Sequence, residues 1–400
     1  MKALRVEGAT SAGPVALKSK GSRMKRRSAL YRPTLGVEEE FQLVERRSGQ
    51  LCSAIERVLE KGQPLFGEQI KPEMHASTVE IISPVCADIA AVRQALGTLR
   101  RSLIEVLAAE DLVPVSAGTH PTARWQDQQR TERERYAELE EEEQDVGRSL
   151  LIFGLHIHVG IPDREIAIAV MNQARLWLPH LLALSANSPF WAGRLTGIKS
   201  YRSVVWKRCN RSGLPEVLPN LAHFERYVDD LIQVGAIDNG KRIWWDIRLH
   251  PFFDTLEFRI CDMPATLEDT LALTALCQAL VAKLCLLHQQ GVTTFVLPRL
   301  YIEENKWLAM RDGLDATYID FPNRRRLSMR EAIGELLDFV ADVADELGSQ
   351  REMAYLRALL TDPRGTGADR QIAIYRQTGA IDQVIRLLIE QTTQGVLEVA

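Results

Sequence analysis

The chain has 400 residues, of which 46% are hydrophobic, so it is long enough to form one large domain or two ordinary ones with a packed core. Its formal charge of −4 and its sequence pI near 6.1 give no overall basicity, and composition therefore suggests no nucleic-acid partner. We find no internal repeat and no linker rich in Pro, Gly or Ser that would divide the chain. We therefore expect a globular protein.

The first 32 residues differ from the rest of the chain. They contain nine basic residues and a single acid, Glu7, and they lack the apolar segment of a secretory signal. The favoured interpretation is a disordered basic tail. A gene start placed too early, with translation beginning near Met24, ranks second, and an organelle presequence ranks third. We expect one domain over residues 33–400.

The cysteines and the most apolar segment indicate a cytoplasmic protein. Six cysteines are scattered without a C-x-x-C pair, which favours free thiols in a reducing compartment over disulfides or a zinc site. The most apolar run, residues 271–287, contains Gln278 and Lys283. It is therefore predicted to be a buried helix, and no membrane partner is expected.

A strand with two acids on one face is predicted over residues 34–44. Val37, Phe41 and Leu43 alternate with Glu38 and Glu40. Side chains two apart share a face of an extended strand and lie about 7 Å from each other, so these carboxylates repel unless a positive group intervenes. A solvated acidic edge is the simpler alternative for this segment alone.

A second strand is predicted over residues 71–85, with Glu73 near its start and Glu80 along it. Pro84 ends this strand, and Asp88 caps a long amphipathic helix that implies core packing only. Residues 124–148 are dense in charge, and this pattern favours a solvated helix over a mobile lid.

Two histidines share one face of a third strand, in the segment 150–161. His156 and His158 are flanked by Gly154 and Gly160, which allow close approach of another group. Satisfied core histidines and ligands to a metal or substrate both remain open for this pattern. Asp163 then caps a helix over 164–186 that Pro179 should kink or split.

The last strand pair also carries polar residues. Over residues 243–250, Trp244, Asp246, Arg248 and His250 share one face. Over 255–260, Glu257 and Arg259 share another, and residues 251–254 suit a hairpin. From residue 267 the chain is predicted to be helical, with a buried helix to His288, a helix over 299–312 and one opened by the Ser328 and Glu331 capping box.

If these strands form one sheet, five acids gather on one surface: Glu38, Glu40, Glu73, Glu80 and Glu257. Several partly buried negative charges a few Å apart would cost several kcal/mol or would take up protons. Divalent cations remove that conflict. Oxygen ligands with at most one imidazole favour Mg²⁺ or Mn²⁺, which in such sites bridge to nucleotide phosphates. Arg259 would then stabilise a phosphoryl group during transfer.

Five segments together resemble one protein family. They are Gly36-Val-Glu-Glu-Glu-Phe41, Thr78-Val-Glu-Ile-Ile-Ser-Pro-Val-Cys86, Gly154-Leu-His-Ile-His-Val-Gly160, Leu184-Ser-Ala-Asn-Ser-Pro-Phe-Trp191, and Asp246-Ile-Arg-Leu-His-Pro251 with Thr255-Leu-Glu-Phe-Arg259. In order and spacing, from about residue 33 to residue 390, the chain resembles the YbdK-type carboxylate-amine ligases, also called type 2 glutamate-cysteine ligases. These enzymes are related to glutamine synthetase.

The resemblance implies an α+β fold like that of glutamine synthetase, with a curved, mostly antiparallel sheet backed by helices. It also implies that ATP phosphorylates a carboxylate, such as that of L-glutamate. An amine, such as that of L-cysteine, then attacks the acyl phosphate and forms an amide. A homodimer is left open.

The resemblance implies residue roles as well. Glu40, Glu73 and Glu80 would bind one metal ion, and Glu38, His156 and Glu257 a second, with Glu38 and Glu257 sharing a third beside the nucleotide. Arg259 would contact the transferred phosphoryl group. The ATP and substrate pocket would be bordered by Lys199, Ser200, Arg202, His158, Trp245, Arg248 and His250.

The chain departs from the family pattern at Arg194-Leu195, over residues 207–213 and at Asp254, which leaves the metal ligands intact and puts the substrate in doubt. Two other readings remain. One is a phosphotransferase of the guanidino-kinase type, and the other is a non-catalytic protein that binds nucleotide or an amino acid.

Overall fold

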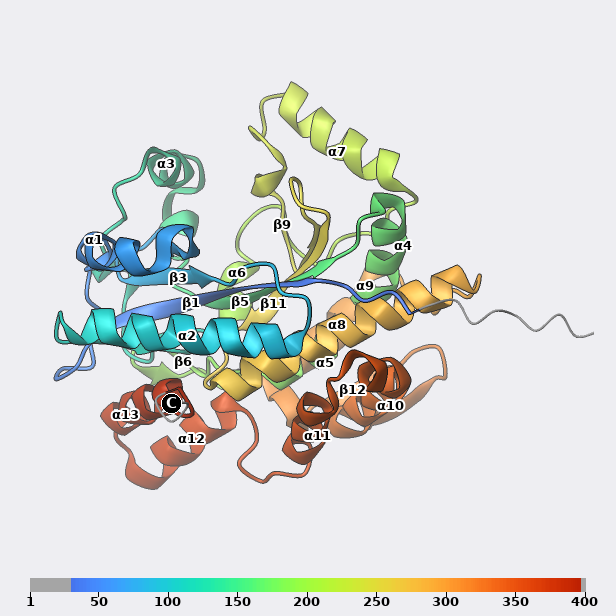
Figure 1. Ribbon diagram of the computed structural model, residues 1–400. Helices are drawn as coiled ribbons and strands as arrows, with labels where there is room; N and C mark the ends of the chain where they lie inside the picture. Colours follow the sequence, from blue (N-terminus) through green and yellow to red (C-terminus); the bar gives the residue numbers. More distant parts are fainter. Residues whose placement is uncertain (1–29, 397–400) are drawn as a thin grey trace, which may run out of the picture.

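The computed structural model describes residues 30–396 (Figure 1). Most of the basic tail predicted over residues 1–32 therefore lies outside the described residues. At the end of that predicted tail, Leu30 and Tyr31 pack against the core, and the Tyr31 hydroxyl donates to the carbonyl of Gly160 at 3.0 Å. The ordered fold therefore includes residues that precede the predicted domain boundary at residue 33.

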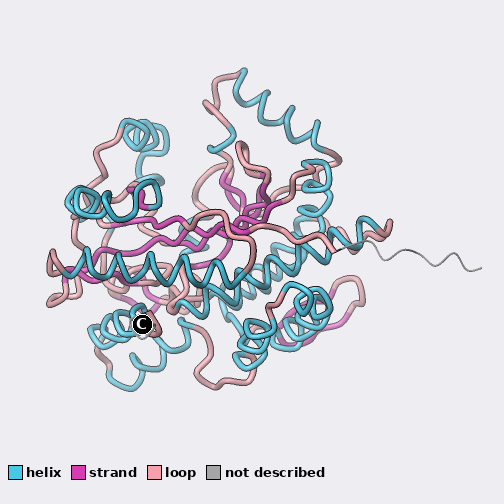
Figure 2. Tube along the Cα trace, in the orientation of Figure 1, coloured by secondary structure: helices cyan, strands magenta, loops and turns pink. Residues whose placement is uncertain are grey.

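A seven-stranded sheet with antiparallel pairing between neighbours forms the centre of the molecule (Figures 1 and 2). β1 is its longest strand and lies between β3 on one side and β5 and β4 on the other. The strands, in spatial order, are β10 (Ile247–Leu249), β11 (Thr255–Asp262), β5 (Gly154–Gly160), β1 (Leu35–Glu45), β3 (Thr78–Ile82) and β2 (Ile70–Pro72), with β4 (Leu112–Val115) also paired to β1.

Helices cover one face of this sheet, as the resemblance implied. α2 (Ile89–Ala108) and α8 (Leu267–Gln289) lie against it, and α8 also packs on α4, α10 and α11 (Figure 1). The remaining helices are α1 (Ile55–Phe66), α3 (Glu134–Arg148), α4 (Arg164–Ala174), α5 (Leu178–Ser185), α6 (Tyr201–Trp206), α7 (Leu221–Gln233), α9 (Arg299–Asp312), α10 (Met329–Leu347), α11 (Gln350–Leu359), α12 (Gly367–Thr378) and α13 (Ile381–Thr393).

Three short strand pairs lie outside the main sheet. They are β6 (Phe190–Trp191) with β7 (Arg194–Leu195), β8 (Ser212–Gly213) with β9 (Trp244–Trp245), and β12 (Thr317–Asp320) with β13 (Arg325–Ser328). The β8–β9 pair is parallel, and it stands with α7 above the face of the sheet opposite α2 and α8 (Figure 1).

The helix signals predicted from the sequence are confirmed. The Asp88 carboxylate accepts from the amide of Ala91, and that of Asp163 accepts from the amides of Glu165 and Ile166. Pro179 lies in the first turn of α5, so the predicted 164–186 helix is split in two. α8 is long and apolar enough to span a membrane by composition, yet 83% of its most apolar window is buried in the protein, as predicted for a core helix.

Two strand predictions were wrong in part. The predicted strand over 71–85 is two strands, β2 and β3, because Pro72 lacks the amide that would continue the ladder and the chain turns before Thr78. Glu73 therefore lies in that turn. The predicted strand over 243–250 is also broken, since β9 and β10 belong to different sheets and Asp246 between them pairs with Lys306 at 2.5 Å.

The solvated helix predicted over residues 124–148 is present only from residue 134, as α3, and residues 124–133 form a loop with one 3-10 turn. Within α3, only Tyr136 and Gly147 are buried. Gln144 has a φ of 49°, a left-handed conformation that interrupts the helix near its end. α3 stands on the same side of the sheet as α7 (Figure 1).

Candidate active site on the open face of the sheet

The alternation of β1 divides its acids between two faces. Val37, Glu39 and Phe41 are buried toward the helices, and Glu38 and Glu40 point to the opposite face. Antiparallel pairing places Glu40 directly across from Glu80 on β3, and Glu38 directly across from His156 on β5. Three neighbouring strands therefore present ligand side chains to one space.

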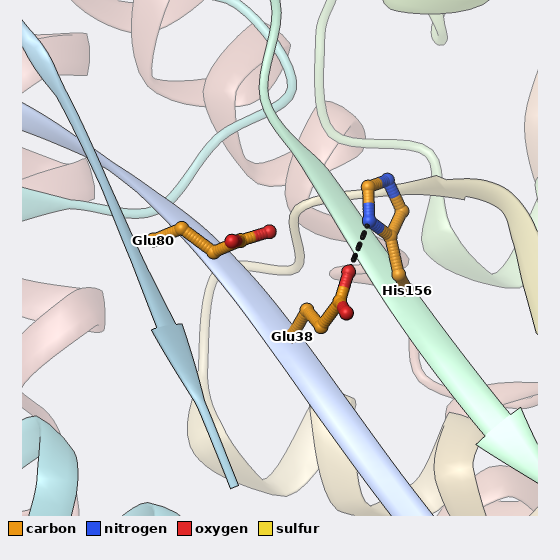
Figure 3. Close-up of side chains that lie close together, drawn as sticks. All are labelled: Glu38, Glu80 and His156. Atoms are coloured by element: carbon orange, nitrogen blue, oxygen red, sulfur yellow. Dashed lines mark hydrogen bonds and ion pairs between the residues drawn. The ribbon is translucent and has the colours of Figure 1, made fainter. Parts of the chain in front are cut away.

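Carboxylates and imidazoles meet there in three overlapping groups, in each of which the ligand atoms all lie within 4.8 Å of one another. Figure 3 shows the first group, in which three strands direct side chains toward one another. The groups are Glu38 with Glu80 and His156, Glu38 with His158 and Glu257, and Glu40 with Glu73 and Glu80. Every residue predicted to bind metal belongs to at least one group.

The group of Glu40, Glu73 and Glu80 carries unbalanced negative charge. Burial, and then the neighbouring Glu73, raises the pKa of Glu40 to about 7. Burial and the carboxylates around it raise the pKa of Glu80 well above its usual range. Among the described residues, no Lys or Arg forms a salt bridge with any of these three acids. The group thus has the charge conflict expected of an acidic site that binds a cation.

The histidines belong to the second part of the site. A ring nitrogen of His156 lies 3.0 Å from a Glu38 oxygen, and one of His158 lies 3.2 Å from the other oxygen. Burial, followed by the Arg259 charge, lowers the pKa of His156 to about 4, so its imidazole is neutral at pH 7 and can bind a metal. For His158, burial is outweighed by Glu257 and Glu38, and its pKa is raised.

Glu257 lies between two arginines. Arg248, directly opposite on β10, donates from Nε to Glu257 at 2.7 Å, and Arg259 also forms an ion pair with the carboxylate. Burial acts to raise the pKa of Glu257, but Arg248 and Arg259 outweigh it and hold the pKa well below the usual range. Arg259 keeps its Nε without a hydrogen-bond partner among the described residues, so it retains a free donor beside the acids.

The donor set fits hard divalent cations. Carboxylate oxygens dominate all three groups, with one imidazole in each of two, which suits Mg²⁺ or Mn²⁺ better than Zn²⁺. The raised pKa values of Glu40 and Glu80 agree with this reading, because a cation would let both ionise.

Gly154 allows other groups to approach β5 closely, as predicted from the sequence. Its amide donates to the Glu40 carboxylate, and a Cβ at this position would overlap the guanidinium of Arg202. Arg202 in turn donates to the carbonyls of Arg259 at 3.2 Å and Ile260 at 3.4 Å. Arg202, predicted to border the ATP pocket, is thus buried against β5 and β11, and its charge acts to lower the pKa of Glu40.

Two other residues predicted to contact the cofactor are engaged elsewhere. Lys199 forms ion pairs with Asp315 at 2.6 Å and with Asp369 at 2.5 Å. The Ser200 hydroxyl is fully buried and donates to Asp262 at 2.8 Å. The structure does not bring either side chain to the acids, because the loop is anchored to α9 through the amides of Lys199 and Ser200 and to the end of β11 through Asp262.

Sequence reasoning missed Arg135 and Trp206. Arg135, on α3, donates to the Pro72 carbonyl at 3.3 Å, and its charge acts to lower the pKa of Glu73. The Arg259 guanidinium lies 5.7 Å from the centre of the Trp206 ring. One arginine does not stand out in so charged a segment as α3, and no local pattern placed Trp206 near Arg259.

The chain matches known proteins along nearly its whole length. Residues 34–387 match the model of glutamate-cysteine ligase family 2. Proteins from Sorangium cellulosum and Solibacter usitatus, both with the provisional name glutamate–cysteine ligase 2, are 48% and 46% identical to it. Each alignment covers 91% of this chain, with 97% of the Sorangium protein and 95% of the Solibacter protein.

Solved structures show the same fold at low sequence identity. A glutamate–cysteine ligase from Francisella tularensis in complex with AMP has a TM-score of 0.68 and 14% identity, over 91% of this chain and 89% of that one. A bifunctional glutathione synthetase from Pasteurella multocida has a TM-score of 0.67 and 13% identity, over 92% of this chain and 53% of that one. The predicted α+β fold of the glutamine-synthetase type and the predicted ligase class are confirmed. The chain belongs to glutamate-cysteine ligase family 2, and it is an ATP-dependent ligase that forms carbon–nitrogen bonds.

Proposed function

We propose that this enzyme uses ATP and Mg²⁺, or Mn²⁺, to join the side-chain carboxylate of L-glutamate to the amine of L-cysteine, giving γ-glutamylcysteine, ADP and phosphate. The observation that carries the proposal is the meeting of five acids and two histidines on one face of the sheet. The relatives' provisional name supports the two substrates. Six free cysteines support a cytoplasmic location.

In this proposal, Glu40, Glu73 and Glu80 hold one cation, and Glu38, His156 and Glu257 hold another, with His158 beside Glu38 and Glu257. Bound cations would neutralise the phosphate oxygens as charge develops on them. The residues of the chain fix the ligands: Arg248 holds Glu257 on one side, and the pairing of β1 with β5 aligns Glu38 with His156.

Arg259 has the role of stabilising the phosphoryl group. Transfer of the γ-phosphoryl from ATP to a carboxylate oxygen breaks the bond to ADP and forms an acyl phosphate, with charge spread over the equatorial oxygens. The free Nε of Arg259 can donate to those oxygens while another nitrogen stays on Glu257. The amine then attacks the acyl carbon, and phosphate leaves as the amide forms.

A test of this function is ADP release with glutamate and a panel of amines. We expect release to need both a carboxylate and an amine, with glutamate and cysteine the best pair, and the amide to be found by mass spectrometry. ATP hydrolysis without an amine, or a stable phosphorylated product, would overturn the ligase proposal for this pair. Glu257→Gln should lose turnover while circular dichroism shows a folded protein.

A further inference from the structure

The tip of the β10–β11 hairpin carries two phenylalanines exposed to solvent. Phe252 and Phe253 are 61% and 59% exposed, and they follow His250 in the turn between the two strands. Tight turns usually carry polar residues, Gly or Pro, because large apolar side chains gain nothing from water there. Two adjacent exposed phenylalanines at this position are therefore typical of a surface that binds another group.

The ring of Phe253 belongs to a series of rings that ends at the acids. It stacks face to face on His250, with centroids 4.4 Å apart and planes at 8°. Both rings approach His158 edge-on, His250 at 5.5 Å and Phe253 at 6.5 Å. Because His158 lies 3.2 Å from Glu38 and belongs to the same candidate metal group, the Phe253 ring is in direct contact with that group.

Hydrogen bonds hold this stack in place. The Nδ1 atom of His250 accepts from the backbone amides of Phe252 at 3.2 Å and Phe253 at 3.0 Å. The same ring therefore fixes the turn and supports the side chain above it. A ring held in this way loses little conformational freedom when a ligand stacks on it.

Phe252 has the same exposure but a different setting. Its ring lies 6.2 Å from His250 in an edge-on arrangement, and the Nζ atom of Lys241 lies 5.2 Å from its centroid. Among the described residues, it makes no ring contact with His158. It is thus a natural control for Phe253, in the same turn and equally accessible.

We propose that Phe253 is the platform on which the adenine base of ATP stacks. The base extends the column of His250 and Phe253, and the triphosphate reaches from there to the Glu38, His158 and Glu257 group and to Arg259. This inference rests on the proposed ATP-dependent function. Because a ring face supplies stacking without a hydrogen-bond pattern, the contact strengthens binding of a nucleotide without selecting its base.

Kinetics with matched variants test the platform. Phe253→Ala should raise the KM for ATP roughly tenfold and leave kcat nearly unchanged, as expected for the loss of one stacked base. Phe253→Trp should keep the wild-type KM, and Phe252→Ala should change it less than twofold. Inorganic tripolyphosphate, which has no base, should inhibit wild type and Phe253→Ala with the same constant.

A binding measurement gives a readout that does not depend on turnover. The triphosphate of 2-aminopurine riboside loses fluorescence when its base stacks, so wild type with Mg²⁺ should quench it and Phe253→Ala should not. An unchanged KM and unchanged quenching in Phe253→Ala would overturn the proposal. So would an equal effect of Phe252→Ala, or tripolyphosphate inhibition that weakens in parallel.

The two proposals fail in different ways. If the wild type forms no amide from glutamate and cysteine but quenches the probe through Phe253, the proposed function fails and the base platform stands. If the wild type forms the amide and Phe253→Ala binds ATP normally, the platform fails alone. Thermal unfolding of each variant, expected within a few degrees of wild type for an exposed side chain, shows that the fold is kept.

Discussion

Adjacent glutamates on β1 have opposite surroundings. Glu39 faces the helices, is fully buried, and accepts from Arg100 Nε at 2.9 Å and from the Thr270 hydroxyl at 2.8 Å. Glu40 faces the open side, and it lies opposite Glu80 without a salt bridge to any Lys or Arg of the described residues. The chain neutralises the first acid itself and leaves the second to a group from solution.

This difference separates structure from function. Glu39 is buried with Arg100 as its partner and needs no further group to balance its charge. Glu40 and Glu80, by contrast, are like charges directly opposite on paired strands, which destabilise a sheet when both are ionised. The open face therefore retains a repulsion that a bound cation would relieve. Four changes test this division.

The largest effect should come from the closed face. Arg100→Met leaves Glu39 buried without its partner, and we expect it to lower the free energy of unfolding by about 3–5 kcal/mol. Urea unfolding measures this loss. Adding Glu39→Gln to Arg100→Met should restore part of it, and Mg²⁺ should restore none. A loss below about 1 kcal/mol would contradict the structural role assigned to the pair.

Glu80→Gln should act in the opposite sense on the open face. Turnover and Mg²⁺ affinity should both fall at least about 100-fold, since even residues behind the direct ligands cost 10–100-fold. Without metal, however, the variant should be as stable as wild type or more so, because Gln is neutral like the protonated Glu80 carboxyl and the folded chain no longer has to protonate that buried acid. Calorimetry with Mg²⁺ and urea unfolding in EDTA give the two numbers. A strongly destabilised metal-free variant would place Glu80 with Glu39 as a structural acid.

The pH dependence of stability should also reveal the open face. In the folded chain the pKa of Glu40 is raised to about 7, above the ordinary value near 4.5, so the folded state binds the proton more tightly than the unfolded state. Metal-free stability should therefore be highest below pH 4.5 with respect to this group and should fall as the pH rises through 7. The difference in unfolding midpoint between wild type and Glu40→Gln, measured in EDTA from pH 4.5 to 8, isolates this slope from the buried histidines, whose lowered pKa values act in the opposite sense. Mg²⁺ should flatten the difference, and a rise in the stability of wild type relative to Glu40→Gln as the pH rises would contradict the prediction.

The smallest effect concerns Lys199. Because it pairs with the exposed Asp315 and with the mostly buried Asp369, Lys199→Met should cost about 1 kcal/mol of stability and leave the KM for ATP unchanged. Thermal unfolding and ADP release measure both. A large rise in KM with unchanged stability would return Lys199 to the nucleotide site, where the family resemblance had placed it.

The sequence contains the alternation that places Glu38 and Glu40 on one face, so the gathering of candidate ligands from β1, β3, β5 and β11 could be predicted from the strands that carry them. The helix caps at Asp88, Asp163 and Ser328 could also be predicted from the sequence, since each depends on hydrogen bonds between the capping residue and the first turn of its own helix.

What the sequence could not supply depends on contacts between distant segments. Pro72 marks the end of β2, but nothing near Glu73 shows that the chain turns back there to pair β2 with β3, and nothing near Ser200 shows that Asp262, 62 residues away, accepts its hydroxyl. The grouping of His158 with Glu38 and Glu257 likewise follows from strand register, which is set by the whole sheet.

The register of β1 with β3 and β5 limits where residues can be inserted into or deleted from this chain. A one-residue insertion or deletion inside β1, β3 or β5 would turn every side chain beyond it to the opposite face, exchanging Glu40 for Glu39 or His156 for Ile157. Tolerated length variants should therefore be confined to the connections between strands, and the spacing of acids within each strand should be as fixed as the acids themselves.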